Sequence, residues 1–506
     1  MRDLLIGIDI GSTNIRCAVY DTAGRLVSLA SCGSERAMSK ETWGFGEDEL
    51  PDTVIGLCNE AIAQIEDTYH IHGMAVACIG CGAMVIGHDG KLIHLKGDYK
   101  AQARAFFDAI SLREVFNITG YPPNHDNLAF RMGAHTGAEI FGMGAHIGAE
   151  IAAVLSIADY VAFRLTGEKS REYSTACSMG LWDNRNREWW KDLFNAAGAD
   201  TTKMGEVVNS GTLVGEVLPY ISDTSRIPRG TKVYTGGHDY LCSSFAANGH
   251  NNQVIVNIVG TYEIMASFHD KPWQREPGNT DPIRPLVDNH VLPGKYSYQI
   301  EVYGAGQTEW LRNKVFAADA AQWGDCFAQL EQRDFTAPST ELFIPHLFGQ
   351  IVPSVNMDAK GAYLFLTDKT DRISLLMATI EGLCYKSREM LDAQRKVAAL
   401  DFTLKMVGGG SKSRAWVQAK ADILNIPVHV PNIKEATALG AAMLAGVGAG
   451  VYSDYIEAMQ AIARLGEEVF EPRKVIAEQY EEIYHYQYLT CALLGDKLRK
   501  HKITNI

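Results

Sequence analysis

The 506-residue chain lacks several features that would assign it to common classes of protein. Basic residues are not in excess: 47 Lys and Arg against 60 Asp and Glu leave a net charge of −13. This balance argues against a nucleic acid or an anionic membrane as partner. No basic-then-apolar leader opens the chain, because Asp3 and Asp9 interrupt the only apolar run at the start. The ten cysteines have no regular spacing, which predicts reduced thiols in a cytoplasmic protein.

Long hydrophobic runs are also missing. The most apolar late stretch, residues 436–452, is short for a bilayer span and rich in glycine. We therefore expect a buried helix that packs closely on a sheet. The remaining composition, with 46% hydrophobic and 21% charged residues, is that of an ordinary globular protein. The length predicts two to three domains.

The hydrophobic pattern predicts mixed strands and helices. Residues 4–31 alternate and turn like three antiparallel strands. The other predicted elements are a helix at 48–69, a strand at 73–87, a helix at 156–167 closed by Gly167, a strand, glycine turn and helix over 230–249, and a strand, glycine turn, helix and strand over 404–430.

A second strand–turn–strand pattern, at residues 253–268, repeats the opening of the chain. Each pattern is followed by mixed strand and helix, which indicates a duplicated α/β domain. We place the boundary in the polar segment near 245–255, giving domains 1–248 and 249–506.

A shorter repeat lies at residues 132–153, where two consecutive eleven-residue segments match at eight positions. As a helix, it would bring His135 near Glu139 and His146 near Glu150, a conceivable metal site. Glycine-rich helices are weak scaffolds for ligands, so a packing or surface helix is the favoured interpretation.

The first motif with chemical meaning is Asp9 at the end of an apolar strand. A turn of small residues follows, and Arg16 lies on the returning strand. A carboxylate beside backbone N–H groups and hydroxyls suits Mg²⁺ bound to phosphates. A buried Asp that caps its own turn is the alternative. The turn residues are Gly11, Ser12, Thr13 and Asn14.

Two further glycine turns could contact a nucleotide. Gly260 and Thr261 lie at the second hairpin, opposite the first in a duplicated fold. Gly408, Gly409 and Gly410 open a helix after a strand, which lets a phosphate or nucleotide approach the backbone closely. This run is neither a Walker A loop nor a Rossmann fingerprint.

Asp239 follows a double glycine at a predicted helix start, in the sequence GGHD. Such a carboxylate is accessible and suits a general base that takes a proton from a hydroxyl. An ordinary helix N-cap is the alternative. The pair Cys78 and Cys81 has no second pair to complete a zinc site, so structural thiols are favoured.

Together these motifs resemble the FGGY carbohydrate kinases of the actin-like ATPase superfamily. The matching stretches are IGIDIGSTNIR, GGHD, VGTYEIM, VGGGSKSRAWVQAKADILNIPVHV and EATALGAAMLAGVGAGVY. The resemblance implies two ribonuclease-H-like α/β domains with a central cleft, and transfer of the γ-phosphate of ATP to a sugar hydroxyl with Mg²⁺. A non-catalytic actin-like ATP-binding switch is the alternative, although a switch would not need Asp239.

The resemblance also implies roles for individual residues. Asp9 would lie near Mg²⁺, with Ser12, Thr13, Asn14 and Arg16 around it, and Asp239 would be the base. Gly260 and Thr261 would hold the phosphates. The residues placed against or near the adenosine are Gly408, Gly409, Gly410, Ser413 and Glu309.

The acceptor is expected to be a five- or six-carbon ketose or sugar alcohol, L-fuculose-like or xylulose-like. GGHD, GTYE and TEWLR resemble the L-fuculokinase branch, but Gly82 stands where that branch has an acidic residue. The residues expected to face the sugar are Gly82, Met84, His238 and Asp239. The loop that includes Gly82 and Met84 offers no charge to a small triol, so glycerol should be a poor acceptor. A homodimer is left open.

Overall fold

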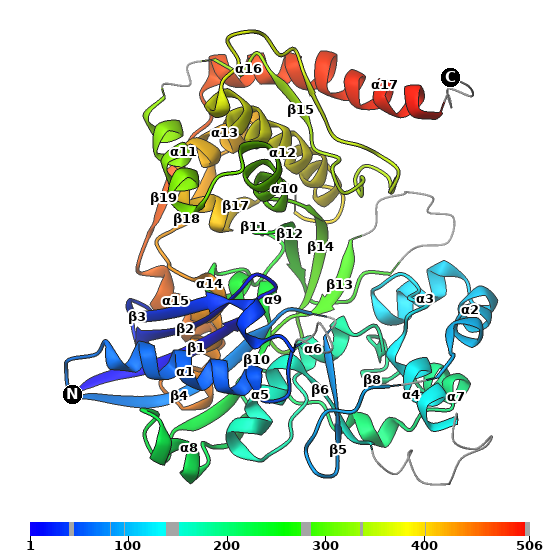
Figure 1. Ribbon diagram of the computed structural model, residues 1–506, viewed down its shortest axis with the longest axis vertical. Coiled ribbons are helices and arrows are strands. Elements are labelled where there is room, and N and C mark those ends of the chain that lie inside the picture. The colour runs from blue at the N-terminus through cyan, green and yellow to red at the C-terminus, as the bar shows by residue number, and fades with distance from the viewer. Residues whose placement is uncertain are drawn as a thin grey trace.

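The computed structural model describes residues 1–39, 45–80, 82–95, 97–137, 151–274, 285–333, 337–399 and 401–500. The chain forms two α/β halves, which lie one above the other in Figure 1. Each half contains one large β-sheet with helices packed against it (Figure 1).

The first half contains a six-stranded sheet in the order β3-β2-β1-β4-β10-β9. β1, β4 and β10 are parallel, whereas β2, β3 and β9 are antiparallel to their neighbours. The strands are β1 (Arg2–Ile10), β2 (Asn14–Asp21), β3 (Leu26–Gly33), β4 (Tyr69–Cys78), β9 (Leu213–Glu216) and β10 (Lys232–His238).

The second half repeats this topology and adds one edge strand. Its seven-stranded sheet has the order β13-β14-β12-β11-β17-β18-β19, with β11, β17 and β18 parallel. The strands are β11 (Val254–Val259), β12 (Tyr262–His269), β13 (Leu286–Asn289), β14 (Tyr296–Tyr303), β17 (Thr403–Gly408), β18 (Val428–Pro431) and β19 (Glu467–Phe470). Without β13, the two sheets have the same strand order and directions, so the predicted duplication is confirmed.

Seventeen α-helices are assigned in the described chain. Those of the first half are α1 (Glu49–Ala63), α2 (Lys100–Ala109), α3 (Leu112–Thr119), α4 (Leu128–Gly137), α5 (Ile157–Thr166), α6 (Tyr173–Ser178), α7 (Lys191–Ala197), α8 (Pro219–Thr224) and α9 (Asp239–Ala246). Those that follow are α10 (Gly306–Trp310), α11 (Ala320–Gln332), α12 (Arg372–Gln394), α13 (Arg414–Leu424), α14 (Ala436–Gly448), α15 (Tyr455–Ala463), α16 (Lys474–Glu482) and α17 (Leu489–Lys500).

Short strand pairs complete the fold. They are β5 (Ala83–Gly87) with β6 (Ile151–Ser156), β7 (Trp182–Asp183) with β8 (Glu188–Trp189), and β15 (Leu342–Ile344) with β16 (Ala362–Leu364).

The late glycine-rich helix α14 packs on the sheet of the first half. Alternate residues of β1 face opposite layers: Leu4 belongs to the core beneath α1 and α5, and Leu5 to the core with α14. A Cβ on Gly7 would lie 1.7 Å from the carbonyl oxygen of Ala438, so only glycine lets α14 lie this close. The predicted buried helix is therefore confirmed. Because α14 returns to the first sheet, the boundary at 248/249 separates the strands but not every helix, and it stays a prediction.

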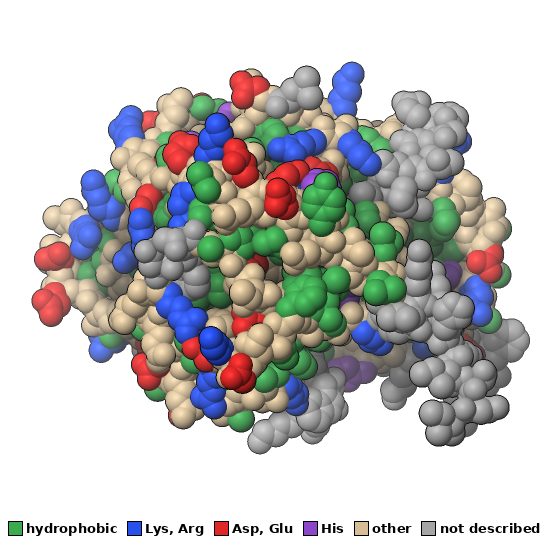
Figure 2. Space-filling view, turned by 90° about the horizontal axis from the view of Figure 1, so that it is seen from above, with side chains coloured by type: hydrophobic (Ala, Val, Ile, Leu, Met, Phe, Trp, Pro, Cys, Tyr) green, Lys and Arg blue, Asp and Glu red, His purple; other side chains and the backbone are tan. Residues whose placement is uncertain are grey.

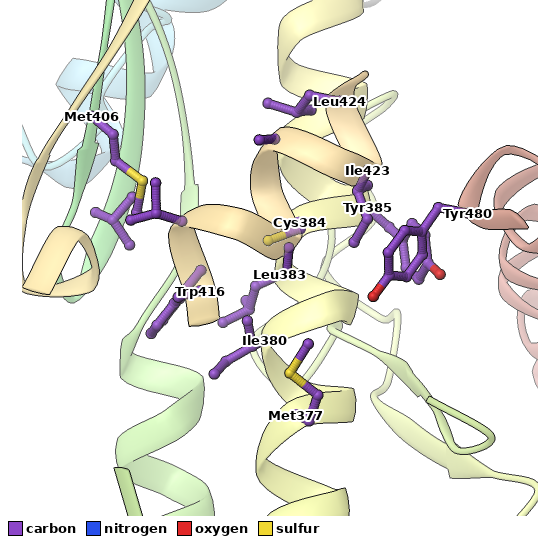
Figure 3. Packing of buried hydrophobic residues seen from close by; sticks show 14 of the residues in the cluster. Met377, Ile380, Leu383, Cys384, Tyr385, Met406, Trp416, Ile423, Leu424 and Tyr480 are labelled. Carbon is purple, nitrogen blue, oxygen red and sulfur yellow. The ribbon is translucent and has the colours of Figure 1, made fainter. Parts of the chain in front are cut away.

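The second half has its own core, shown in Figure 3. α12 and α13 pack together there, with Trp416 lying beside Leu383 and Met406 reaching in from β17 (Figure 3). Tyr480 of α16 closes one side next to Tyr385, with ring centroids 6.2 Å apart. The helix that follows the glycine loop is thereby anchored in a rigid core.

Several sequence predictions are confirmed. The three-stranded opening is present as β1–β3, and the second hairpin is β11–β12. α5 begins after Ser156, whose hydroxyl accepts the N–H of Asp159, and it ends at Gly167 with φ 80°. The strand, glycine turn, helix and strand predicted at 404–430 are also present.

Other predictions were wrong in detail. The strand expected at 73–87 is two strands, β4 and β5, that belong to different sheets. No turn occurs at Gly236 and Gly237, because β10 continues through both. A Cβ on Gly236 would lie 1.9 Å from the carbonyl oxygen of Val76, so this glycine permits close strand pairing, with a register shift beside it.

The short repeat falls largely outside the described residues, since 138–150 are not described. His135 is buried at the end of α4, and its predicted partner Glu139 lies outside the description, as do His146 and Glu150. The last residues of the repeat, from Ile151, form strand β6 instead of the expected helix.

The surface fits the composition. In Figure 2 acidic and basic side chains are interspersed over the visible face, and no broad basic area is seen among its coloured residues. Across the described residues, every helix is either too short or too polar to pass through a lipid bilayer.

Candidate active site

Strand register brings the two predicted carboxylates together. Asp9 of β1 is level with Ala77 of β4, and Ala77 is level with Gly237 of β10. Asp239 follows two residues later, at the same end of the parallel strands. The carboxyl ends of parallel strands are where open α/β sheets place ligand sites.

Asp9 is paired with arginine across its own hairpin. Its Oδ2 lies 3.0 Å from Nη1 of Arg16, and its side chain is 8% exposed. Burial raises the pKa of Asp9 to about 6, and the nearby Arg16 guanidinium opposes that rise. A carboxylate that is costly to ionise gains from any further cation, and the metal role of Asp9 stays a prediction.

Asp239 is the first residue of α9 and keeps 29% of its side chain exposed. The N–H of Tyr240 donates to its Oδ1 over 2.6 Å. Burial, followed by the charge of Asp9, raises the pKa of Asp239 to about 7. A proton acceptor with this pKa is matched to general-base work near neutral pH.

His238 is buried between Asp239 and the strand-end glycines. Its Nε2 lies 3.5 Å from Oδ1 of Asp239. Burial lowers the pKa of His238 to about 3, so the imidazole is neutral. A Cβ on Gly80 would lie 2.4 Å from the His238 ring, so the chain after β4 lies too close to this histidine for a larger residue at position 80. Its expected role as a sugar contact stays a prediction.

The second hairpin and the glycine loop lie side by side. Gly408 pairs with Val259, the residue before Gly260, in the parallel register of β11 and β17. Backbone N–H groups of the loop before α10 donate to the carbonyl oxygens of Gly260 and Thr261 and fix this tip. The two predicted phosphate and nucleotide contacts therefore share one edge of the second sheet.

Two glycines at this edge have no packing reason to be glycine. A Cβ on Gly260 or Gly409 would meet its nearest atom at 3.6 Å and 3.8 Å, respectively, which is ordinary contact. By contrast, a Cβ on Gly410 would lie 2.5 Å from Val259, and Gly408 has φ 94°. The free space above Gly260 and Gly409 fits a backbone that a ligand approaches closely.

The tips of the two hairpins meet across the gap between the halves. The hydroxyl oxygens of Thr13 and Thr261 lie 3.3 Å apart. Ser12 and Thr13 are exposed, and Gly11 and Asn14 close the turn through a 3.0 Å backbone hydrogen bond. These hydroxyls and N–H groups can donate to phosphate oxygens from both sides.

Two residues predicted near the adenosine have different surroundings. Glu309 is exposed on α10, directly after the loop that fixes Gly260 and Thr261. Ser413 is 6% exposed; its hydroxyl caps α13 and donates to Glu331 over 2.6 Å. The hydroxyl of Ser413 thus has a structural role in holding the loop.

A cavity of about 770 Å³ opens beside the first sheet. Gly82 and Met84 line it, as predicted for the acceptor side, together with Tyr121 and Arg131. Asp239 and His238 are not among its lining residues. Gly80, two residues before the lining residue Gly82, lies close to the His238 ring, because a Cβ on Gly80 would be 2.4 Å from that ring.

Sequence reasoning missed the acidic partner of Arg16. Glu435, just before α14, lies 3.1 Å from Nε of Arg16, and Lys412 of the glycine loop lies 3.0 Å from the same carboxylate. Glu435 has φ 51°, an unusual backbone for a non-glycine residue. Neither the pairing nor the backbone has a local signal in the sequence.

The donor set around Asp9 fits Mg²⁺ of the kind that bridges phosphates. In the described residues, no group of three or more His, Cys, Asp or Glu side chains is placed to hold a metal ion. Mg²⁺ in phosphotransferases uses one or two carboxylates plus substrate phosphates instead of an all-protein cage. Asp9, whose pKa is raised by burial, would be such a carboxylate.

These features define a class of protein. Two ribonuclease-H-like halves, with a pair of carboxylates at the first sheet and open glycine turns at the second, are the arrangement of an actin-like phosphotransferase. Residues 255–449 match the C-terminal domain of the FGGY family of carbohydrate kinases, and residues 145–246 match its N-terminal domain. The chain belongs to this family and is a sugar kinase. The class that its motifs predicted is confirmed.

Similar proteins can be aligned with nearly the whole chain. A xylulose kinase of Staphylococcus epidermidis is 23% identical, covering 96% of this chain and 95% of its own length. An autoinducer-2 kinase of an Enterobacter species is 25% identical, with 94% and 92% covered. The crystal structure of a gluconate kinase from Lactobacillus acidophilus shares the fold, with a TM-score of 0.78 at 19% identity and 99% and 100% covered. The non-catalytic alternative finds no support among them.

Proposed function

We propose that the protein phosphorylates a hydroxyl of a five- or six-carbon ketose or sugar alcohol, with xylulose-like and L-fuculose-like compounds as first candidates. The cavity carries this proposal. Its volume of about 770 Å³ exceeds the needs of a three-carbon triol, and Gly82 with the first residues of β5, Ala83 and Met84, offers it no charged group. Relatives named xylulose kinase support the sugar size.

The chain's own residues suggest how transfer is assisted. Asp239, with its pKa raised to about 7, accepts the proton of the acceptor hydroxyl at the start of α9. Arg16 holds Asp9 in place, and the N–H groups at Thr261 and Gly409 hold phosphate oxygens. The N–H of Gly260 closes its own turn, because it donates to the carbonyl oxygen of Tyr262 over 2.9 Å. Bound Mg·ATP supplies the phosphoryl group and the cation that offsets its charge. Closing the two halves, whose tips already meet at Thr13 and Thr261, excludes water.

The direct test is ADP release over a panel of acceptors. The panel contains D-xylulose, L-fuculose, xylitol, gluconate and glycerol, each with and without protein and with Mg·ATP in excess. We expect a five- or six-carbon ketose or alcohol to give the highest kcat/KM. If glycerol led the panel, the interpretation of the cavity would be wrong. A cytoplasmic location and a homodimer stay predictions.

A further inference from the structure

The acceptor cavity and the base helix are joined by one buried carboxylate, Asp288 of β13. The hydroxyl of Tyr121, a cavity-lining residue, donates to Asp288 Oδ1 over 2.6 Å. The hydroxyl of Tyr240, the residue after Asp239, donates to Oδ2 over 2.8 Å. We call these three residues, Tyr121, Asp288 and Tyr240, the Asp288 bridge.

Two members of the bridge are buried, and the third, Tyr121, is partly exposed to the cavity. Asp288 is 0% exposed and Tyr240 is 2% exposed. Gln299 of β14 donates to Oδ2 over 2.9 Å, so both carboxylate oxygens have partners. Hydrogen bonds to a charged acceptor in such surroundings are about twice as strong as neutral ones. Asp288 therefore holds both tyrosines in defined positions.

A second contact fixes the cavity wall to the same strand. The N–H of Val287 donates to the carbonyl oxygen of Gly120 over 3.1 Å. Gly120 has φ 80°, and a Cβ there would lie 2.1 Å from the carbonyl oxygen of Val287. The chain that carries Tyr121 thus lies directly against β13, independently of the tyrosine bond.

On the other side, Tyr240 controls the surroundings of the base. Its N–H donates to Oδ1 of Asp239, and its ring packs edge-on against His238 with centroids 4.7 Å apart. A shift of Tyr240 would therefore move both neighbours. None of these contacts belongs to the phosphate or nucleotide contacts of the second sheet.

We propose that Asp288 is a positioning residue for the transfer reaction. It fixes Tyr121 on the cavity wall and Tyr240 at the start of α9, so that a bound acceptor and Asp239 keep one relative position. The strand that carries it belongs to the second half of the chain, so the bridge also makes the acceptor geometry depend on how the halves are placed. The proposal rests on the assignment of the cavity to the acceptor.

The test compares single hydroxyl deletions. With the best acceptor of the panel, Tyr121→Phe should raise its KM about tenfold, and Tyr240→Phe should lower kcat about tenfold, since hydrogen bonds to charged groups are worth about 1.5–3 kcal/mol. The double variant should lose less than the product of the two, because each arm acts through Asp288. Asp288→Asn should retain more activity than Asp288→Ala.

Tyr488→Phe is the matched control. Tyr488 is 0% exposed in the second half, and its hydroxyl has no hydrogen-bond partner in the parts of the chain that are described. The bridge is refuted if Tyr121→Phe and Tyr240→Phe match this control in KM and kcat.

Hydrogen exchange of the nucleotide-free protein separates this proposal from the assignment of the acceptor. We expect Tyr121→Phe to accelerate exchange in α9, residues 239–246, although Tyr121 lies in another element. If no panel compound is phosphorylated, the proposed function fails, and the exchange result still decides whether the bridge exists. Unchanged exchange in α9 would overturn it.

Discussion

The two hairpins share a backbone plan but use their carboxylates differently. In the first, Asp9 stands near the end of β1, keeps 8% of its side chain exposed and is paired with Arg16. In the second, Glu263 lies two residues beyond Thr261 and is 1% exposed. Both acids are buried, but the cation that pairs with Asp9 is 28% exposed, whereas the one that pairs with Glu263 is 0% exposed.

The buried acid of the second hairpin has its partners on one oxygen, Oε1, whereas Oε2 has no hydrogen-bond partner among the described residues. Nζ of Lys420, which is 0% exposed, lies 2.6 Å from Oε1 of Glu263 and 2.6 Å from the side-chain oxygen of Asn257. Ser387 donates to the same carboxylate over 2.6 Å. This cluster joins the hairpin to α12 and α13, so it fixes the glycine turns relative to each other. The second hairpin is therefore held by a buried cluster of side chains from two helices.

The largest effect is expected where the duplication is broken. β10 is followed directly by Asp239, whereas its counterpart β18 ends at Pro431 and is followed by Asn432, which has no carboxylate. Asp239→Asn should lower kcat by about 10²- to 10⁴-fold, the usual loss for a general base, with ADP binding nearly intact. Turnover and ADP calorimetry on the same sample check both parts. Wild-type turnover in the variant would mean that Asp239 is not the general base.

The next effect concerns the buried acid. Lys420→Met leaves Glu263 without its cation and should lower the free energy of unfolding by about 3–5 kcal/mol, while kcat at low temperature is retained. Urea unfolding measures the loss. Lys420→Met combined with Glu263→Gln should recover part of it. A stable but inactive Lys420→Met protein would show that this pair takes part in the chemistry instead.

The first hairpin should give the opposite pattern. Asp9→Ala should weaken productive use of Mg·ATP by about 10- to 100-fold, the range found when metal-orienting groups are removed. Its stability should change little, since burial disfavours the charge of this carboxylate. Activity as a function of Mg²⁺ concentration, with a chelator control, decides the metal role. Full activity in excess chelator would exclude it.

Sequence predicted the hairpins well because their signals are local. An apolar strand, a glycine turn and a second strand are adjacent residues, as at Asp9–Arg16 and Gly260–Thr261. The partners of these residues were not predictable: Arg16 pairs with Glu435, and Glu263 with Lys420, which lie far along the chain. The hydrophobic periodicity of a sequence does not predict contacts between residues so far apart.

Glycine was the least reliable single signal. The sequence predicted a turn at Gly236, yet a glycine is needed there because the backbone of the neighbouring strand β4 lies too close for a side chain. A turn was also predicted at Gly409, and here a side chain would meet no close neighbour. Only the neighbouring backbone distinguishes a glycine needed for packing from one that leaves room for a ligand.

The dependence of stability on pH is expected to show a smaller effect, caused by the Asp239 carboxyl group. The pKa of Asp239 is raised from 3.8 to about 7, so the native state binds a proton that the unfolded state releases between these values. Wild-type stability should therefore fall, relative to Asp239→Asn, as pH rises from about 4 to 7, by about 1–2 kcal/mol given the partial exposure of this side chain. Unfolding of the nucleotide-free proteins over this range measures it. Parallel pH curves would contradict the raised pKa.

The smallest effect tests the open glycine of the second half. A valine at position 409 has room within the protein, because its Cβ would meet the carbonyl oxygen of Val259 only at 3.8 Å. Gly409→Val should therefore fold with unchanged stability but weaken ADP binding by about tenfold, or about 1.4 kcal/mol, since its methyl groups occupy the approach to the backbone. Calorimetry with ADP and urea unfolding give the two numbers. Gly410→Val is the matched control: its Cβ would lie 2.5 Å from Val259, so overpacking should cost it about 1–3 kcal/mol of stability. Unchanged ADP affinity in Gly409→Val would remove this turn from the nucleotide site and leave the second hairpin alone to hold the phosphates.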